Sequence, residues 1–362
     1  MSGRPPLDTS RVRVLILQLS AGFAGTERHA AELANGLAPH ADVAVLLRAR
    51  PREADRQAEY TALRAAVAPG IPVFLCSRAA PCIGLWRAVR RFRPDLIHAH
   101  HERSARVATS CANPPGFGVP VVATVHVHYR ARDFGRCRAL VVLNEAERVG
   151  VQAVFPREVA LIENWVMPHP RPDAARLAAL RRALGIAPGD FVVGCVGRLA
   201  PVKRVDGVIA AFAQADLGSS RLVVVGDGGV RPALEAQIAR LGLGDRVRLA
   251  GFRADVRDLY ALFDVLVSNS ADEPYGLVIL EAAASGVPVI ATATDGARAI
   301  AARLPITLVP TDRPEALVQA MRARHAERHA AAPPFAGFGF EDRLPALLAL
   351  YRQVRNGGIS RA

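Results

Sequence analysis

Apolar runs alternate along this chain with longer segments of helical hydrophobic periodicity. The runs of the first half are Val12–Leu19, Asp42–Leu47, Val73–Cys76, Leu96–Ala99, Val121–Val125, Ala139–Leu143 and Ala160–Ile162. Those of the second half are Phe191–Val196, Arg221–Val225, Val247–Ala250, Val265–Val267, Pro288–Ala291 and Thr307–Val309. They are continuously apolar, which is typical of strands covered by helices on both faces. The pattern predicts an α/β fold with parallel sheets.

Length and proline content indicate two domains. The chain has 362 residues, more than one typical domain. Prolines 168, 170 and 172 cluster between the two sets of runs and break the helical pattern. We expect one Rossmann-like domain over residues 1–168, a second over 173–340, and a separate helix within 341–356. That helix carries Leu344, Leu347, Leu348 and Tyr351 on one face.

The charge favours anionic partners. The net charge is +13, made of +8 on residues 1–170 and +5 on residues 171–362, so it is not confined to a tail. Nucleotide phosphates, acidic membranes and nucleic acid all fit such a charge. Nucleic acid is the weakest of the three, because no recognisable binding motif is present and aromatic residues make up only 6% of the chain.

Cysteine usage and hydropathy predict a cytoplasmic protein. The five cysteines are scattered without a CxxC pair, so we expect neither disulfides nor a zinc site. Residues 1–10 do not resemble a signal peptide, and the longest charge-free stretch, 107–125, is interrupted by proline and glycine. The protein is therefore expected to be soluble or peripheral on the inner face of the plasma membrane.

A glycine-containing loop joins the first strand to the first helix. Gly22 and Gly25 allow a ligand to approach the backbone, and the helix that follows favours an anion at its N-terminus. Ordinary turn chemistry explains the glycines equally well. The loop lacks GxGxxG, as does the later Gly226–Gly229 segment, which argues against a nicotinamide dinucleotide.

Histidines gather at the ends of two predicted strands. They are His98, His100 and His101 at the end of one strand, and His126 and His128 at the end of another. A metal site is conceivable, but nothing in the sequence brings the two groups together as ligands. We favour a single cleft histidine, His126, that donates a hydrogen bond to a sugar hydroxyl or phosphate, over an ordinary strand-end histidine. No metal is expected.

Two cations follow the first strand of the second half. Arg198 comes directly after the strand, and Lys203, the only lysine in the chain, lies five residues later. Such a pair suits a diphosphate, although surface cations without a ligand are the simpler alternative. The Walker A pattern GxxxxGK[ST] is absent, so this is not an NTPase phosphate loop.

The most specific motif places two glutamates around a buried helix. Glu273 lies in a loop after a strand, and Glu281 lies within the predicted helix Gly276–Ser285. A carboxylate in an almost wholly apolar helix is costly unless it meets donors, and ribose hydroxyls would serve. The first amides of this helix, near Gly276–Val278, would point at phosphate. A structural salt bridge is the alternative for Glu281.

Taken together, these segments resemble the family 4 retaining glycosyltransferases of the GT-B fold. The similarity covers nearly the whole chain: the Gly22–Glu27 loop, Pro94–His100, Thr124–His126, Val141–Asn144, Gly197–Leu199 with Lys203, Gly226–Gly228, Gly251–Phe252 and the Glu273–Glu281 segment. Two departures stand out. Asn164-Trp165 replaces the usual Asn-Gly before the linker, and Arg204 replaces a frequent glycine after the lysine.

The resemblance implies two Rossmann-like domains facing a cleft, with the acceptor on the first, the nucleotide sugar on the second, and the C-terminal helix packed back on the first. It implies a UDP- or GDP-linked donor and a glycan or lipid-linked acceptor in cell-envelope or polysaccharide biosynthesis. Arg198 and Lys203 would hold the diphosphate, Glu273 the transferred sugar and Glu281 the ribose. His126 would lie near the reacting centre. The implied donor contacts are Gly22, Gly25, Arg198, Lys203, Phe252, Arg253, Tyr275, Gly276, Leu277, Val278 and Glu281.

Two rivals share this fold: a nucleotide-sugar epimerase, and a catalytically silent nucleotide-sugar-binding protein. A requirement for an acceptor would exclude the epimerase, and turnover would exclude the silent protein. No D-x-D pair is present to anchor a divalent ion under the diphosphate, so we expect a metal-independent enzyme. Residues 83–93 place Trp86, Val89 and Phe92 beside arginines on a helix, which suits an anionic membrane surface as well as ordinary packing on the sheet.

Overall fold

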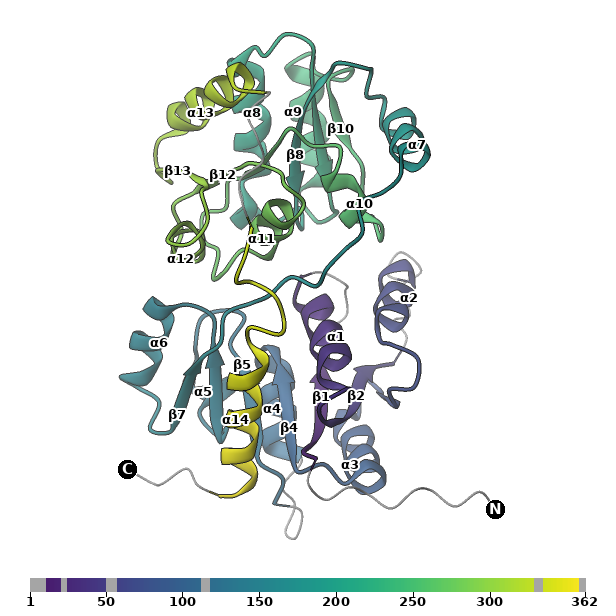
Figure 1. The fold of residues 1–362 in the computed structure, drawn as a ribbon, viewed down its shortest axis with the longest axis vertical. Coiled ribbons are helices and arrows are strands. Elements are labelled where there is room, and N and C mark those ends of the chain that lie inside the picture. Colours follow the sequence, from purple (N-terminus) through teal and green to yellow (C-terminus); the bar gives the residue numbers. More distant parts are fainter. Residues whose placement is uncertain (1–10, 21–24, 50–56, 112–117, 329–334, 358–362) are drawn as a thin grey trace. The chain divides into compact units, whose positions relative to one another are not determined.

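The chain forms two compact units. The computed structural model describes residues 11–20, 25–49, 57–111, 118–328 and 335–357 (Figure 1). Unit 1 comprises Met1–Glu163 and Phe340–Ala362, and unit 2 comprises Asn164–Gly339. The sequence placed the junction at residues 168–173, a few residues later than the division between the units.

Unit 1 is built on a seven-stranded sheet in which all neighbouring strands are parallel. The strand order is β3-β2-β1-β4-β5-β6-β7. The strands are β1 (Arg13–Gln18), β2 (Asp42–Arg48), β3 (Val73–Cys76), β4 (Leu96–His100), β5 (Val121–Thr124), β6 (Ala139–Val142) and β7 (Glu158–Leu161).

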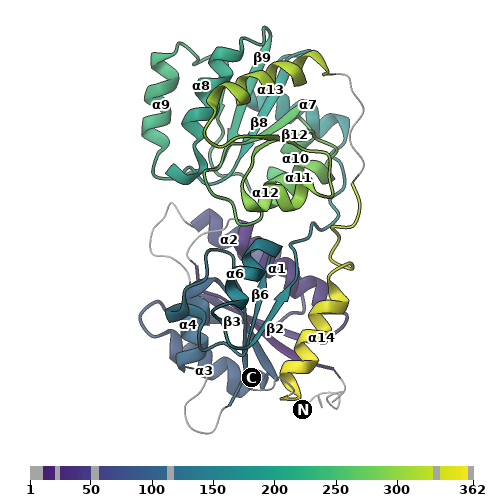
Figure 2. The same cartoon turned by 90° about the vertical axis from the view of Figure 1, so that its left-hand side faces the viewer.

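Helices cover both faces of this sheet, as the continuous apolar strands require. They are α1 (Gly25–Leu37), α2 (Gln57–Ala66), α3 (Pro81–Phe92), α4 (His101–Cys111), α5 (Ala131–Phe134), α6 (Glu145–Gln152) and α14 (Leu344–Arg355). Helices α1, α2 and α14 lie on one face, and α3, α4 and α5 lie on the other (Figures 1 and 2).

Unit 2 contains a six-stranded parallel sheet in the order β10-β9-β8-β11-β12-β13. Its strands are β8 (Phe191–Val196), β9 (Ser220–Val225), β10 (Val247–Leu249), β11 (Val265–Ser268), β12 (Val289–Thr292) and β13 (Thr307–Val309).

The helices of unit 2 also form two layers. They are α7 (Ala174–Leu184), the short 3-10 helix η2 (Pro201–Lys203), α8 (Val205–Ala215), α9 (Arg231–Arg240), α10 (Val256–Tyr260), α11 (Leu277–Ala284), α12 (Asp295–Ala301) and α13 (Pro314–Ala326). Helices α8, α9 and α13 lie on one face of the sheet, and α10, α11 and α12 lie on the other (Figures 1 and 2). The α/β fold predicted from the sequence is confirmed.

The winding of each sheet reverses at one place. In unit 1 the reversal falls between β1 and β4, and in unit 2 it falls between β8 and β11. In open parallel sheets the loops that leave such a pair of strands diverge to opposite faces and leave room for a ligand at the carboxyl ends. Of the predicted site residues, Gly25 follows β1, Arg198 and Lys203 follow β8, and Glu273 follows β11.

Helix α14 belongs to unit 1 although the sequence of unit 2 precedes it. Its buried Tyr351 hydroxyl lies 2.6 Å from Nδ1 of His98 on β4. Phe340, just before the helix, packs so closely on Gly36 of α1 that an added Cβ there would lie 2.5 Å from its ring.

The cysteine prediction was wrong for one pair. Cys82 on α3 and Cys111 at the end of α4 form a disulfide, with a Cα–Cα distance of 5.2 Å. The two residues are 29 positions apart, and only the packing of α3 beside α4 brings them together. Cys76, Cys137 and Cys195 are free and buried.

None of the helices described by the structure is both long and apolar enough to cross a membrane.

Candidate active site

A lysine–glutamate pair lies at the reversal point of unit 2. Lys203 ends the η2 turn that follows β8, and Glu273 lies in the loop after β11. The Lys203 ammonium donates a hydrogen bond to Oε2 of Glu273, and both side chains remain partly accessible. Arg198, in the same β8 loop, is exposed, and the structure shows no ion pair between it and any other described residue. The sequence-predicted group Arg198, Lys203 and Glu273 thus occupies the loops of adjacent strands.

Close backbone packing holds the β8 loop. The amide of Leu199 donates to the carbonyl of Asp227, and a Cβ at Gly228 would lie 2.3 Å from the carbonyl oxygen of Leu199. A Cβ at Gly226 would lie 1.9 Å from the carbonyl oxygen of Gly197. Gly226 and Gly228 belong to the loop after β9, and they allow this loop to pack against the loop that carries Arg198. Their role is structural.

The loop of Glu273 rests on the start of α12. The amide of Gly296 donates to the carbonyl of Glu273 over 3.1 Å. A Cβ at Gly296 would lie 2.4 Å from Cα of Tyr275 and 2.6 Å from the Glu273 carbonyl oxygen. Only a residue without a side chain lets the two segments approach this closely, so Gly296 fixes the position of the loop.

Helix α11 presents its N-terminus beside this loop. Its N-cap Gly276 has φ +98°, a left-handed conformation that favours glycine. The amides of Leu277 and Val278 belong to the first helical turn, which lacks intrahelical acceptors. Tyr275 is buried, whereas Leu277 and Val278 are half-buried. The first turn can therefore meet an anion as the sequence predicts.

Glu281 is buried in α11 and held by a tyrosine from α10. Its carboxylate accepts a hydrogen bond of 2.7 Å from the hydroxyl of Tyr260, which is also buried. This charge-assisted bond offsets part of the cost of burying the carboxylate. The group that binds Oε2 is a neutral hydroxyl and not a cation.

The loop after Gly251 is internally paired. Arg253 forms two hydrogen bonds with Asp255, at 2.7 and 2.6 Å, and Asp255 also accepts from Arg176 of α7. These guanidinium contacts hold the pKa of Asp255 below its usual range. The paired Arg253 orients the loop, and Phe252 beside it is half-buried.

Arg204 occupies a left-handed backbone position, with φ +44°. Related family members frequently have glycine at this position, and glycine is favoured there because it adopts a positive φ without steric cost. Arg204 is held there because its Nη1 donates to the carbonyl of Thr311 over 2.6 Å, while its carbonyl accepts from Asn269.

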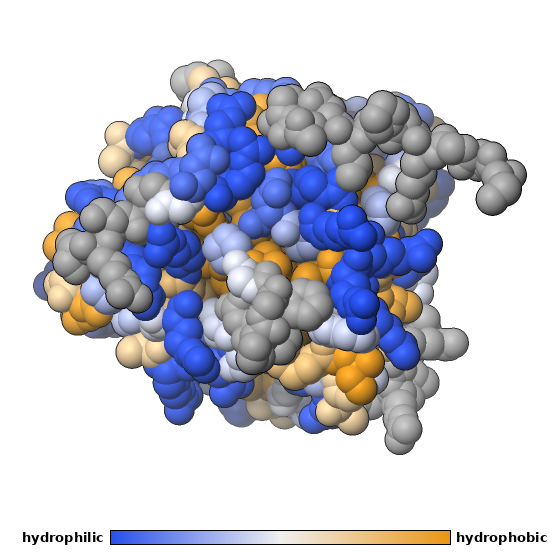
Figure 3. Space-filling model, turned by 90° about the horizontal axis from the view of Figure 1, so that it is seen from below, coloured by the Kyte–Doolittle hydropathy of each residue, from blue (hydrophilic) through white to orange (hydrophobic). Residues whose placement is uncertain are grey.

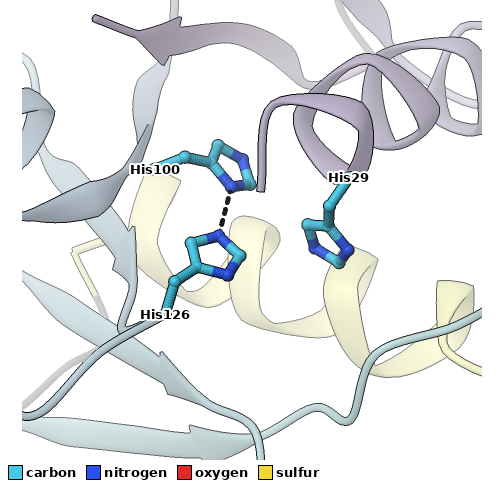
Figure 4. Close-up of side chains that lie close together, drawn as sticks. All are labelled: His29, His100 and His126. Atoms are coloured by element: carbon cyan, nitrogen blue, oxygen red, sulfur yellow. Dashed lines mark hydrogen bonds between the residues drawn. The ribbon is translucent and has the colours of Figure 1, made fainter. Parts of the chain in front are cut away.

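Unit 1 places its histidines at the carboxyl ends of β4 and β5. His100 ends β4, and its Nδ1 lies 2.9 Å from Nε2 of His126, just beyond β5 (Figure 4). His29 on α1 meets both rings edge-on, with centroid distances of 5.6 Å and 5.2 Å. His98 stacks on His100 and is fixed by Thr124 and Tyr351. Gly25 opens α1, and Gly22 lies outside the described residues.

Burial keeps these imidazoles neutral. It lowers the pKa of His29 and of His98 to about 3, and it lowers the pKa of His100 and His126 well below the ordinary value. Neighbouring histidines lower the pKa values of His29, His100 and His126 further. A neutral His126 can donate one hydrogen bond and accept another.

The predicted site residues therefore divide between the two units. Arg198, Lys203, Glu273, Gly276, Leu277, Val278 and Glu281 belong to unit 2, whereas His126 and Gly25 belong to unit 1. The sequence did not reveal Tyr260, Gly296 or His29. Each acts through contact with an element distant in sequence, which the sequence alone does not show.

Comparison with known proteins defines the class. Residues 178–328 match the family model described as glycosyl transferases group 1, and residues 23–166 match that of Glycosyltransferase Family 4. The D-inositol 3-phosphate glycosyltransferase of Rhodococcus erythropolis is 30% identical over 330 residues, covering 78% of this chain and 73% of the relative. The chain belongs to the family 4 glycosyltransferases and takes its sugar from a nucleotide-sugar donor.

Other relatives are named for different products. The 2-deoxystreptamine N-acetyl-D-glucosaminyltransferase of Streptomyces fradiae is 31% identical over 307 residues, covering 73% of this chain and 72% of the relative. The lipopolysaccharide core biosynthesis glycosyltransferase LpsD of Rhizobium meliloti is 31% identical over 212 residues, 58% of each chain.

Solved structures confirm the GT-B fold. Anabaena Alr3699/HepE, crystallised with UDP and glucose, has a TM-score of 0.74 at 22% identity, covering 96% of this chain and 98% of that one. WaaG, a glycosyltransferase involved in lipopolysaccharide biosynthesis, has a TM-score of 0.65 at 18% identity, covering 95% and 94%.

Proposed function

We propose that this glycosyltransferase retains the configuration of the transferred hexose and passes it from a UDP-sugar to a glycan or lipid-linked acceptor of cell-envelope polysaccharide biosynthesis. The observation that carries the proposal is the Lys203–Glu273 pair, with Arg198 and the α11 N-terminus, at the reversal point of unit 2. UDP is chosen over GDP because the structural neighbour HepE was solved with UDP and UDP-glucose.

Unit 2 would bind each part of the donor with a different set of residues. Lys203 and Arg198 would neutralise the diphosphate together with the first amides of α11. Glu281, whose carboxylate Tyr260 orients, would accept from a ribose hydroxyl. Glu273 would contact the sugar and, through its bond to Lys203, couple the sugar to the phosphates.

Catalysis would rest on positioning and on stabilising the leaving nucleoside diphosphate. As the bond between the anomeric carbon and the phosphate oxygen lengthens, negative charge grows on the diphosphate, where Lys203 and Arg198 act. Retention implies that the acceptor arrives on the face that the diphosphate leaves.

The donor site is proposed to work without a divalent ion. Cations supplied by side chains and a helix N-terminus would replace it, and the sequence has no D-x-D pair. We expect full transfer activity without added Mg²⁺ or Mn²⁺. A strict requirement for either ion would show that the assignment of the positive charge is wrong.

The α3 helix is proposed to touch an anionic membrane at the inner face of the plasma membrane. The structure changes the predicted stripe: Val89 is buried in the core and Phe92 is partly buried against it, whereas Ile83 and Trp86 are 55% and 39% exposed. Exposed arginines 87, 90 and 91 flank these two residues, and Arg90 stacks on Trp86. Figure 3 shows small apolar groups interspersed with hydrophilic residues on one face of the molecule.

Vesicle flotation tests the membrane contact. The protein should float with vesicles that contain anionic lipid at low salt and release at high salt. An Arg87→Glu, Arg91→Glu variant should stay in solution. An Arg182→Glu, Arg240→Glu variant, at exposed positions of α7 and α9, serves as the charge-matched control. Equal flotation with neutral vesicles, or unchanged flotation of the Arg87→Glu, Arg91→Glu variant, would contradict the proposal.

A donor panel tests the transferase proposal. UDP-sugars should stabilise the protein against thermal unfolding more than GDP-sugars do, and consumption of the donor should depend on an acceptor. Conversion of the donor to an isomer without any acceptor would instead support the epimerase, and binding without turnover would support a silent binding protein.

A further inference from the structure

Three buried imidazoles converge at the carboxyl edge of the unit 1 sheet. His29 comes from α1, His100 from the end of β4 and His126 from the segment after β5 (Figure 4). One ring nitrogen of each lies within 4.8 Å of those of the other two. Three different elements supply the rings, so the fold holds them together without any local sequence motif.

Several polar atoms at this place have no partner among the described residues. Nε2 of His100 is buried without a hydrogen bond, and so are both amide atoms of Gln18. Gln18 lies opposite His100 in the register of β1 and β4, so both side chains occur at the same edge of the sheet. Buried polar groups are normally satisfied, so these atoms show that the edge of the sheet beside the three imidazoles is a polar environment whose hydrogen-bonding capacity is not used up by the described residues.

The donor set specifies the chemistry of that ligand. Three neutral imidazoles suit a borderline divalent ion, whereas Mg²⁺ and Ca²⁺ prefer the oxygen ligands that the trio lacks. We propose that His29, His100 and His126 form a binding site for a transition-metal ion of the Zn²⁺ class. Water or a substrate oxygen would take the fourth position, as in three-histidine zinc sites.

The arrangement needs only a small adjustment to receive the ion. A tetrahedral Zn²⁺ with bonds of about 2.0–2.1 Å separates its ligand nitrogens by roughly 3.3 Å. His100 and His126 are 2.9 Å apart, so the ion replaces the hydrogen bond between them and His29 moves inward. The ring of His98 stacks on the ring of His100 and restricts its position. The two ring nitrogens of His98 lie within hydrogen-bond distance of the hydroxyls of Tyr351 and Thr124.

The proposed ion site uses none of the cations assigned to the diphosphate. It lies in unit 1, whereas the cations proposed to meet the diphosphate lie in unit 2. The ion would clamp α1 to the ends of β4 and β5, and it would occupy a nitrogen of His126. Its existence can be measured without any sugar transfer.

Titration of the tag-free, chelator-treated protein with Co²⁺ tests the site directly. We expect one ion per chain and the visible absorption typical of tetrahedral cobalt, displaced by Zn²⁺. His29→Gln and His100→Gln should each weaken binding at least tenfold, whereas His40→Gln, an exposed histidine of the same unit, should not. Circular dichroism and thermal unfolding without metal check that each variant is folded.

A variant that replaces one histidine with another metal-binding side chain tests the site without relying on loss of binding. His29→Cys should retain the ion and add a thiolate-to-cobalt charge-transfer band in the near ultraviolet. Zn²⁺ should raise the unfolding temperature of the parent protein and not that of His100→Gln. Absence of stoichiometric Co²⁺ binding by the parent protein, or equal binding by a folded His100→Gln, would overturn the proposal.

Discussion

At the scale of single residues, the two glutamates of unit 2 differ in what holds them. Glu273 is partly accessible and paired with Lys203, whereas Glu281 is buried and accepts from Tyr260. The accessible carboxylate can change partner when the donor arrives. The buried one is fixed before the donor binds, so the two substitutions should have different kinetic signatures.

Glu273→Gln should lower kcat by about tenfold to a hundredfold, since a charged hydrogen bond is worth roughly 1.5–3 kcal/mol. It should leave UDP affinity unchanged or tighter, because Lys203 no longer shares its charge with a carboxylate. Steady-state kinetics and calorimetric UDP binding measure the two effects. Loss of UDP binding in this variant would place Glu273 at the diphosphate instead of the sugar.

Glu281→Gln should weaken UDP binding by about tenfold or more, because the ribose contact is made in ground and transition states alike. Tyr260→Phe is the matched variant: it removes the donor at 2.7 Å without touching the carboxylate, and it should weaken UDP binding less. Unchanged UDP affinity in a folded Glu281→Gln would remove the ribose assignment.

At the scale of elements, glycine packing positions the donor loops. Gly296→Ala would place a Cβ within 2.6 Å of the backbone at Glu273 and Tyr275, so the loop must move. We expect kcat to fall at least tenfold, because displacement of positioning groups is costly. Gly244→Ala, where a Cβ meets nothing within 4 Å, is the control. Equal activity of the two variants would show that the loop position does not matter.

The start of α6 contains a carboxyl whose pKa burial raises to about 7. Glu147 accepts from the amide of Leu143, and its own amide donates to Asn144. The pKa of Glu147 is higher in the folded state than in the unfolded state, so the folded state binds more protons between pH 4.5 and about 7. The free energy of unfolding therefore falls as the pH rises through this range.

Glu147→Gln should therefore stabilise the protein above about pH 7 and have little effect near pH 4. Urea denaturation across this range measures the difference in the free energy of unfolding. Glu145→Gln, an exposed residue of the same helix, is the control. A constant difference between Glu147→Gln and the parent at every pH would contradict the raised pKa.

At the scale of the whole molecule, the architecture follows directly from the hydrophobic pattern. Every predicted apolar run became a strand, with ends shifted by only one or two residues, as at Val12–Leu19 against Arg13–Gln18. Continuous burial on both faces leaves a strong sequence signal. Glu281 was also visible in the sequence, because a carboxylate inside an apolar helix breaks a local rule. Glu273 was visible through its place in a loop after a strand and its spacing from Glu281.

Contacts between distant elements left no such signal. The Cys82–Cys111 disulfide, the Tyr260–Glu281 bond and the approach of His29 to His100 and His126 depend on how helices pack on the sheets. Side-chain identity alone cannot show these pairings, since each residue is also compatible with an ordinary surface or core position. The three-dimensional packing decides between those possibilities.

The central claim is that unit 2 binds a nucleoside diphosphate through the cations after β8. Calorimetric titration of UDP into the parent protein, Lys203→Gln and Arg240→Gln tests it most directly. Loss of a charged hydrogen bond to phosphate should weaken binding by about tenfold to a hundredfold in Lys203→Gln, while the exposed Arg240→Gln on α9 keeps the parent affinity. Equal UDP affinity in all three proteins, with Lys203→Gln folded, would contradict the account.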